Sequence, residues 1–592
     1  MRRMWKGNNM SFFDVLTLIG GLCLFLFGMN VMGTSLEKRA GSGLKSLLGR
    51  LTTGKLAGFL TGLGVTAVIQ SSSATTVMVV GFVNSGLMTL TQAINVIMGA
   101  NVGTTVTAWL LSMTGIQGDN FFVQMLKPTS FTPILALIGI VLYMGAKSGK
   151  KKDTGMILLG FATLMFGMHT MSSAVSGLSD VPQFRNILIM FSNPVLGVLA
   201  GAVLTGIIQS SSASVGILQA LASTGQVTYG SAIPIIMGQN IGTCVTALLS
   251  SVGTNKNARR AAVVHLTFNI IGTTIWLTVF CLANAIFKFS FVSLPADQMG
   301  IAVVHSVFNV LCTALLLPCS GLLEKFARRI IPDSATEERK TELDERLMTT
   351  PSIAIERCRI VTMEMATNAV DALNSSLDQI TAYDADCAAH IRAQEEETDH
   401  YEDSLGTYLV KLSTRAMSDQ DSTESAQLLH VIGDFERISD HAVNILESAE
   451  EIREKQIHFS PAAERELNQL IGAVRECLDL TLQAFRADDL ETARKVEPLE
   501  QVIDVLHNQL RSRQVLRLQR GECTIEDSFV WTDLLTSMER VSDHCSNIAG
   551  CVLEMAHASL DLHQFLSDVR AEDPQYIARY NAFAKKYALV EG

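Results

Sequence analysis

The sequence predicts an all-α protein in which a polytopic membrane domain is followed by a soluble helical domain. Residues 1–323 contain long apolar runs and carry a net charge of +12, with the charges confined to short connections. Residues 324–592 carry a net charge of −23 and show periodic apolar positions with few turn residues. This acidic half has no basic patch, which argues against a nucleic-acid partner.

Seven apolar segments of the first half are long enough to span a bilayer. They cover residues 14–33, 89–113, 131–147, 155–176, 228–253, 261–287 and 298–322. Basic residues precede the first segment, as in a signal peptide, but no small-residue cleavage site follows. We therefore expect a retained membrane helix near the N-terminus.

Two further apolar regions are interrupted by the same polar tetrapeptide, Gln-Ser-Ser-Ser, at Gln70–Ser73 and Gln209–Ser212. The flanking arms are residues 56–70 and 74–88 in the first region and residues 195–209 and 213–227 in the second. A helical arm of about 15 residues extends about 23 Å, less than the roughly 30 Å hydrocarbon core. Two short arms that meet at a polar tip predict a re-entrant helical hairpin, which needs protein or a water-filled cavity around it.

The first half is an internal duplication. The pairs LFGM and MFGM, QSSSA and QSSSA, and IMGANVGTTVTA and IMGQNIGTCVTA all recur with one common separation, that of Gln70 from Gln209. We call this separation the repeat offset. The two repeats cover about residues 14–147 and 155–287, and the span at 298–322 is additional.

The distribution of positive charge predicts that the two repeats have opposite orientations. The connections 34–55, 147–153 and 254–260 carry most of the Lys and Arg residues and should be cytoplasmic. Three spans then separate equivalent positions, so the first hairpin enters from the cytoplasm and the second from outside. Inverted repeats with discontinuous helices are a secondary-transporter architecture.

Eleven scattered cysteines without a C-x-x-C pair suit a reducing cytoplasm. We expect a multi-pass protein of the cell (inner) membrane with a cytoplasmic C-terminal domain.

The hairpin regions lack acidic residues, because no Asp or Glu lies between Glu37 and Asp119 or between Asp180 and Asp297. Basic residues are equally absent around both tips, so an ion must be held by neutral groups. A serine cluster that starts a helix supplies hydroxyl and backbone N–H groups for an anion. Hydroxyl and carbonyl oxygens equally suit a small hard cation such as Na⁺. An anion neutralised by sodium ions fits this composition.

A G-x-N-x-G-T segment follows each tetrapeptide at the same distance and predicts a helix break, because glycine permits unwinding. The candidate substrate and sodium ligands are Gln70, Ser71, Ser72, Ser73, Asn101, Thr104, Thr105, Gln209, Ser210, Ser211, Ser212, Asn240 and Thr243. Helix packing by small residues is the alternative explanation, but duplication at the ends of short arms favours binding. His265 and His305, in AVVHLTFN and AVVHSVFN, are either proton or anion ligands or packing residues.

The acidic half contains a second duplication, in which DFERISDHAVNI at Asp434–Ile445 is matched by SMERVSDHCSNI at Ser537–Ile548. Each segment places Glu and Asp on one helix face with a spacing of four, and earlier helices carry pairs with the same spacing. Two such helices packed together would bring four carboxylates into a metal site, whereas a solvated acidic stripe is the alternative. The candidate metal ligands are Glu395, Asp399, Glu436, Asp440, Glu500, Asp504, Glu539 and Asp543.

Residues 12–322 resemble the sodium–phosphate cotransporter family, whose hallmark is two QSSS segments each followed by G-x-N-x-G-T. The resemblance implies sodium-coupled movement of inorganic phosphate, with Gln70–Ser73 and Gln209–Ser212 lining the substrate and sodium sites. It also implies a homodimer in the lipid bilayer. The direction of transport and the sodium stoichiometry stay open.

Residues from about 345 to 560 resemble a PhoU domain, on the basis of the duplicated acidic segments. This resemblance implies two three-helix bundles, E-x-x-x-D motifs that bind a divalent or iron-type metal, and a partner in phosphate signalling. We place the transport domain at residues 1–323, a linker at 324–344 and a PhoU-like regulatory domain at 345–592.

The sequence therefore predicts a sodium-coupled secondary transporter of inorganic phosphate with a C-terminal regulatory domain. A non-transporting membrane sensor of phosphate and a phosphate exporter are the alternatives. Two intact hairpins favour transport, since a sensor needs only one access path. Neutral donors select an oxyanion by size and geometry, so arsenate also fits. No nucleophile–base pair, Walker loop or dinucleotide fingerprint is present in the sequence, and we expect no enzymatic activity.

Overall fold

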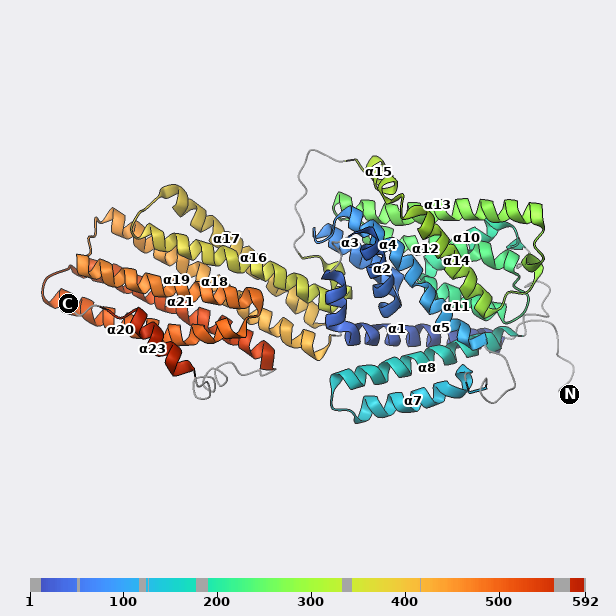
Figure 1. Ribbon diagram of the computed structural model, residues 1–592, viewed down its shortest axis with the longest axis horizontal. Coiled ribbons are helices and arrows are strands. Elements are labelled where there is room, and N and C mark those ends of the chain that lie inside the picture. Colours follow the sequence, from blue (N-terminus) through green and yellow to red (C-terminus); the bar gives the residue numbers. More distant parts are fainter. Residues whose placement is uncertain are drawn as a thin grey trace. The chain divides into compact units, whose positions relative to one another are not determined.

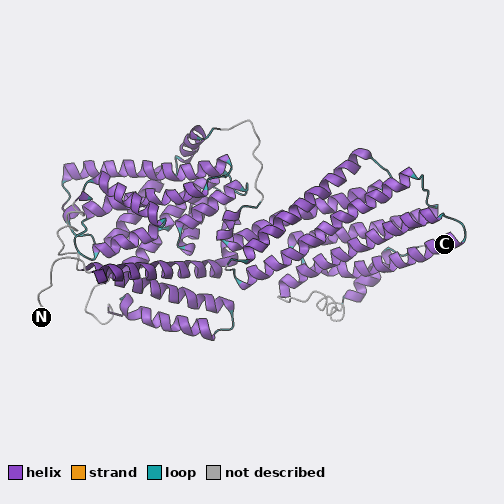
Figure 2. Ribbon diagram, turned by 180° about the vertical axis from the view of Figure 1, so that it is seen from behind, coloured by secondary structure: helices purple, strands orange, loops and turns teal. Residues whose placement is uncertain are grey.

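The structure is a computed structural model that describes residues 12–49, 54–115, 124–125, 127–176, 190–332, 343–415, 417–557 and 575–589. These ranges are helical, and their one strand-like pairing is an isolated bridge between Thr228 and Pro295 (Figure 2). Contacts divide the chain into two compact units, Met1–Ile353 and Ala354–Gly592 (Figure 1). Each unit is described separately below.

The first unit contains the two sequence repeats. The first repeat consists of α1 (Phe12–Gly49), α2 (Lys55–Ile69), α3 (Ser72–Asn84), α4 (Leu90–Gly103), α5 (Thr105–Ser112), η1 (Met113–Gly115) and α7 (Pro128–Gly145). The second consists of α8 (Gly149–Val175), α10 (Pro194–Ile208), α11 (Ser211–Ala222), α12 (Tyr229–Ser250) and α13 (Lys256–Phe287). The unit is completed by η3 (Ser290–Ser293), α14 (Gln298–Leu316), α15 (Ser320–Ile330) and η4 (Glu345–Thr349). Helices α2, α3 and α4 precede α10, α11 and α12 by the repeat offset, so the structural repeat coincides with the sequence repeat.

Helices α1 and α8 occupy equivalent places in the two repeats and pack side by side (Figure 1). Along their contact, Gly21 meets Met171 and Gly28 meets Leu164. Residue numbers rise along one helix as they fall along the other, so the two helices are antiparallel. Glycine permits this close approach, since a Cβ at Gly28 would lie 2.3 Å from the backbone nitrogen of Leu164. The repeats are therefore inverted relative to each other, which confirms the prediction.

Seven helical segments of the described residues are long and apolar enough to cross a membrane, and they correspond to the seven predicted spans. The hairpin arms α2, α3, α10 and α11 are shorter, with 12 to 15 residues each. The last predicted span was too long, because α14 ends at Leu316 and a separate helix, α15, begins at Ser320. Pro318 explains the break, since proline lacks an N–H and disfavours a helical conformation in the preceding residue.

Of the helix breaks predicted at the two G-x-N-x-G-T segments, only the first is present, and neither segment is unwound. Helix α12 passes through residues 238–243 without a break, and only Thr104, which has helical dihedral angles, separates α4 from α5. The glycines instead allow close packing of α4 on α2 and of α12 on α10. A Cβ at Gly99 would lie 1.9 Å from a backbone oxygen of α2, and a Cβ at Gly238 would lie 2.0 Å from one of α10. The first arm of each hairpin thus packs closely against the following long helix of its own repeat.

The second unit is a bundle of long helices. They are α16 (Pro351–Gln379, apart from its first residues), α17 (Ala385–Ser413), α18 (Asp419–Glu454), α19 (Pro461–Ala487), α20 (Leu490–Gln519), α21 (Ile525–His557) and α23 (Tyr576–Lys586). Helix α17 packs on α18, the helices α19, α20 and α21 pack on one another, and α18 lies against α21. The rings of Phe435 and Phe485, 5.4 Å apart, join α18 to α19 within the apolar core. The two motif helices, α18 and α21, therefore lie side by side.

Both ends of the predicted linker, residues 324–344, belong to the first unit. Helix α15 continues to Ile330, and the buried Arg260 guanidinium donates to the Ile331 carbonyl at 2.7 and 2.9 Å. The short helix η4, which the sequence placed at the start of the second domain, packs against α3. The boundary between the compact units consequently falls at residues 353/354, after η4.

Candidate functional site

The two hairpin tips have the same backbone geometry. Gln70 and Gln209 end the first arms with φ angles of 61° and 58°, and each donates its N–H to a threonine carbonyl of its own arm at 2.7 Å. Ser71 and Ser210 are the N-caps of the second arms, and each hydroxyl accepts a backbone N–H at 3.2 Å. The glutamine, in the left-handed backbone conformation, ends the first arm, and the serine after it caps the start of the second arm. The residues of each QSSS sequence therefore form the turn at the tip.

The two tips meet in the interior of the first unit. The Ser72 and Ser211 hydroxyl oxygens, which are equivalent in the two repeats, lie 3.5 Å apart, and both side chains are buried. The Ser73 hydroxyl donates to the Gln209 carbonyl at 3.3 Å. A pseudo-two-fold axis between the repeats therefore passes between Ser72 and Ser211.

Two threonines that the sequence reasoning missed complete this arrangement. The Thr107 hydroxyl donates to Oε1 of the buried Gln70 at 2.9 Å, and the Thr246 hydroxyl donates to that of Ser73 at 3.4 Å. Thr107 and Thr246 are equivalent in the two repeats and lie within the matching sequence strings that revealed the duplication. Their repetition was a signal that could have found them. Gln209, unlike Gln70, is exposed.

The other predicted ligands lie on α4, α5 and α12 or, for Thr104, between α4 and α5. Except for Asn101, their side chains hydrogen-bond to nearby backbone carbonyls. The side chains of Thr104, Thr105, Asn240 and Thr243 all donate to carbonyls three or four residues earlier. Asn101 is different, because its Oδ1 lies 3.4 Å from Nε2 of the buried His265. The structure thus brings Ser72, Ser73, Ser211 and Gln209 together, whereas Asn101 forms a separate contact with α13.

The electrostatics of the paired tips favour an anion. Helices α3 and α11 both begin at the meeting point, so their positive dipole ends converge there. The sequences of α3, α4, α5, α11 and α12 contain no Asp, Glu, Lys or Arg. The site is therefore electrically neutral apart from the helix dipoles and the hydroxyl groups.

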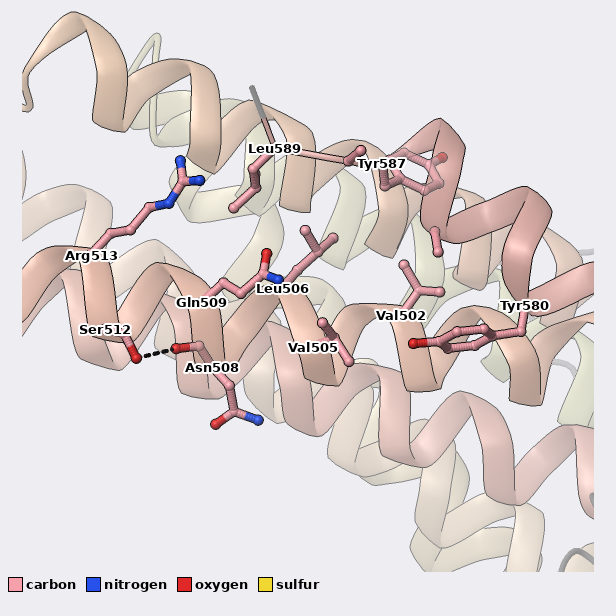
Figure 3. Close-up of a pocket in the computed structure, with 12 residues that line it drawn as sticks. Val502, Val505, Leu506, Asn508, Gln509, Ser512, Arg513, Tyr580, Tyr587 and Leu589 are labelled. Carbon is pink, nitrogen blue, oxygen red and sulfur yellow. Dashed lines mark hydrogen bonds between the residues drawn. The ribbon is translucent and has the colours of Figure 1, made fainter. Parts of the chain in front are cut away.

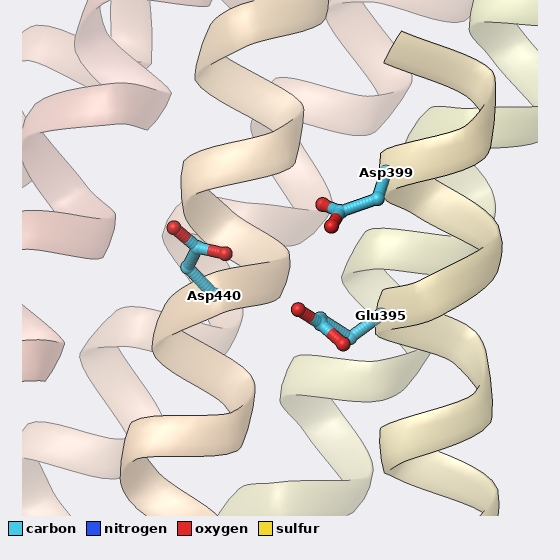
Figure 4. Close-up of side chains that lie close together, drawn as sticks. All are labelled: Glu395, Asp399 and Asp440. Carbon is cyan, nitrogen blue, oxygen red and sulfur yellow. The ribbon is translucent and has the colours of Figure 1, made fainter. Parts of the chain in front are cut away.

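The second unit contains two acidic clusters at equivalent places. Glu395 and Asp399 of α17 face Asp440 of α18, as Figure 4 shows, with ligand oxygens within 4.8 Å of one another. Glu500 and Asp504 of α20 face Asp543 of α21 in the same way. Each cluster thus joins three of the four predicted carboxylates. Glu436 and Glu539, the fourth members of the two sets, lie outside these groups of three.

Burial and mutual repulsion disfavour the charged form of several of these carboxylates. Burial, and then the neighbouring carboxylates, raise the pKa of Glu500 to about 8 despite a hydrogen bond from Gln501, while burial and Glu539 raise the pKa of Asp543 to about 6. Burial and Asp440 raise the pKa of Glu436 to about 7. Three carboxylate oxygens on facing helices are a ligand set that suits a hard divalent cation. A cation there would stabilise the charged forms.

A cavity of about 760 Å³ lies along the contact between α20 and α23 in the second unit (Figure 3). Its apolar lining includes Val502 and Leu506, and Tyr580 and Tyr587 close one side. The one charged residue of the lining, Arg513, is paired with Glu466 at 2.7 Å. Because this positive charge is neutralised, the cavity is not suited to phosphate.

The seven apolar helices and the two inverted repeats are those of a membrane protein. A family model for the Na⁺/Pi-cotransporter matches residues 24–173 and 164–307, and one for the PhoU domain matches residues 362–449 and 467–552. Residues 24–307 therefore belong to the Na⁺/Pi-cotransporter family, and the C-terminal half carries the PhoU domain. Each model matches twice, in accordance with the two duplications.

Similar proteins match either most of the chain or one of its parts. The chain is 26% identical over 551 residues to the "Putative inorganic phosphate export protein YjbB" of Salmonella typhimurium, covering 91% of this chain and 97% of that one. It is 40% identical over 133 residues to the human "Sodium-dependent phosphate transport protein 2B", covering 21% of this chain and 19% of that one. The crystal structure of the phosphate transport system regulatory protein PhoU from Streptococcus pneumoniae aligns at 14% identity with a TM-score of 0.32, covering 36% of this chain and 99% of that one.

Proposed function

We propose that this protein is a sodium-coupled secondary transporter of inorganic phosphate, which binds between the two hairpin tips. The observation that carries the proposal is the approach of Ser72 and Ser211 to 3.5 Å at the point where α3 and α11 begin. Hydroxyl and first-turn N–H groups can donate hydrogen bonds to an oxyanion at this point, and the two positive helix ends attract it. Phosphate is the substrate class of the family to which this half of the chain belongs.

Sodium coupling explains how a site without fixed positive charge binds a multiply charged anion. Helices α3, α4, α5, α11 and α12 provide no Lys or Arg to neutralise phosphate. Sodium ions held by hydroxyl and carbonyl oxygens at the tips would supply the missing charge. Gln70, Ser73 and Gln209 are candidate sodium ligands, since all three belong to the tips and carry side-chain or backbone oxygens there.

The inverted repeats supply a route for alternating access. The antiparallel packing of the equivalent helices α1 and α8 supports entry of the two hairpins from opposite sides of the membrane. Movement of one repeat against the other would open the paired tips to each side in turn. In such a coupled carrier the net direction follows the combined sodium and phosphate gradients, which accommodates both import and export.

We assign the acidic half a regulatory role in the cytoplasm. Its PhoU domain supports a function in phosphate control and a phosphate-signalling partner, and its two carboxylate clusters would hold a divalent or iron-type cation. The family resemblance also supports a homodimer within the lipid bilayer.

Equilibrium binding of radiolabelled phosphate to the purified full chain tests the site. Binding in sodium chloride should be at least about tenfold tighter than in potassium chloride at the same ionic strength, because each bound sodium ion neutralises the anion. Equal affinities in the two salts would contradict sodium coupling at the tips.

A further inference from the structure

A short segment that precedes the second unit is anchored in the first unit beside the first hairpin. We call residues 344–348, Asp344 to Met348, the anchor segment. Asp344, Leu347 and Met348 are each less than 5% exposed. The segment is separated by two residues from α16, the first long helix of the acidic half, and it packs on α3, the second arm of the first hairpin.

An aspartate and an arginine fasten this segment to the ends of two helices. The Asn84 amide, at the end of α3, donates to the Asp344 carboxylate at 2.7 Å. The Arg346 guanidinium pairs with that carboxylate at 3.1 Å and donates to the Ser250 and Val252 carbonyls at 2.6 and 2.9 Å. A cation at the C-terminal carbonyls of α12 is favoured by the helix dipole.

Asn84 extends the network to the beginning of α13. Its Oδ1 accepts the backbone N–H of Asn255 at 2.8 Å, and the Asn255 side-chain amide donates back to the Asn84 carbonyl at 2.8 Å. The side-chain oxygen Oδ1 of Asn255 in turn caps α13 by accepting the N–H of Ala258. The anchor segment is therefore bonded to α3 and α12 and, through Asn84, to α13.

The two repeats differ where the segment binds. Gly81 of α3 has its counterpart, at the repeat offset, in Ala220 of α11. A Cβ at Gly81 would lie 3.0 Å from Cδ2 of Leu347, so glycine makes room for that leucine. Asn84 likewise corresponds to Ser223, whose hydroxyl donates to the Ala220 carbonyl of its own helix. The first hairpin alone thus carries the side chains that fit the anchor segment.

We propose that the anchor segment is the coupling element through which the acidic half acts on the first hairpin. Displacement of the N-terminus of α16 would pull on Asp344 and Arg346 and so on the end of α3, whose other end carries Ser72. This inference rests on the proposed function, because it assigns the regulation to one arm of the transporting hairpin.

A charge exchange in the full-length protein tests the anchor. Asn84→Asp places a second carboxylate against Asp344 and should speed amide hydrogen exchange in residues 80–86 and 250–256 at least tenfold. The double variant Asn84→Asp with Asp344→Asn restores one carboxylate and one amide, and exchange should return to within threefold of the wild type. The matched control, Ser223→Asp at the equivalent place in the second repeat, should leave residues 250–256 unchanged.

Phosphate flux in proteoliposomes then tests the coupling. Arg346→Gln should change the flux rate at least threefold while phosphate binding at the tips is retained. Wild-type exchange in Asn84→Asp, or no recovery in the double variant, would overturn the anchor. Altered exchange with an unchanged flux rate would overturn its role in regulation. If the wild type itself shows no flux, the proposed function fails, whereas the exchange result still decides whether the anchor exists.

Discussion

At the hairpin tips, the hydroxyl groups of Ser72 and Ser211 have a different environment from many other hydroxyl groups on the helices of this protein. Many helix hydroxyl groups of this protein donate to carbonyls of their own helix, as Thr76 and Ser85 do. Ser72 and Ser211 instead face each other across the pseudo-two-fold axis. A ligand that separates the two side chains could accept a hydrogen bond from each of them.

Replacement of both serines should weaken phosphate binding strongly. A hydrogen bond to a charged ligand contributes about 1.5–3 kcal/mol, so Ser72→Ala with Ser211→Ala should lower the affinity at least about 100-fold. Equilibrium binding of labelled phosphate in sodium chloride measures this change. Ser85→Ala, on the same hairpin arm but remote from the tip, is the matched control and should bind normally. Wild-type affinity in the double variant would remove the tips from the site.

The acidic clusters predict a pH-dependent stability of the second unit in the absence of metal. Folding raises the pKa of Glu500 from its ordinary value of 4.5 to about 8. The folded state therefore binds the proton more tightly than the unfolded state does. The resulting stabilisation is complete below pH 4.5 and is lost as the pH rises through 8. The free energy of unfolding should therefore decrease between these values.

Glu500→Gln provides the control for this titration, because it keeps the shape of the side chain but cannot ionise. Calorimetry of the metal-free full chain should show that the variant gains in melting temperature over the wild type as the pH rises from 5 to 8.5. Saturating Mg²⁺ or Mn²⁺ should stabilise the wild type more than the variant. A difference that does not vary with pH would contradict the assignment.

At the scale of the helices, glycines determine how closely each hairpin packs on the next helix. Gly99→Ala and Gly238→Ala would insert a methyl group 1.9 and 2.0 Å from a facing backbone oxygen. Such overpacking costs about 1–3 kcal/mol or more, since backbone atoms on both helices must move. Each variant should lower the melting temperature of the first unit. Gly206→Ala is the control, because its Cβ would meet only Val245 Cγ2 at 3.5 Å and should be tolerated.

The same glycines show what a sequence can and cannot predict. The QSSS tips, the short arms and the inversion follow from patterns along the chain, namely segment length, polarity and the repeat offset. Gly99 packs against the backbone of α2, and no pattern in the sequence around Gly99 indicates this contact. Glycine in that segment was therefore interpreted as a sign of an unwound helix. Thr107 and Thr246 are repeated in the sequence, but only the fold shows which tip each of them contacts.

At the scale of the whole molecule, the family assignment and the duplications describe a transporter half and a PhoU half on one polypeptide. The division between the compact units lies after η4, although the composition already changes near residue 323. The boundary between the compact units lies after the change in composition because Asp344 and Arg346 form hydrogen bonds and an ion pair within the first unit. Amino-acid composition does not indicate such contacts.

The central claim, sodium-coupled transport through the paired tips, is tested most directly by labelled phosphate flux in proteoliposomes. We predict that an imposed sodium gradient drives phosphate across the membrane in the wild type, that reversal of the gradient reverses the flux, and that Ser72→Ala with Ser211→Ala abolishes it. Phosphate binding without flux under either gradient would contradict the transporter and favour a membrane sensor of phosphate.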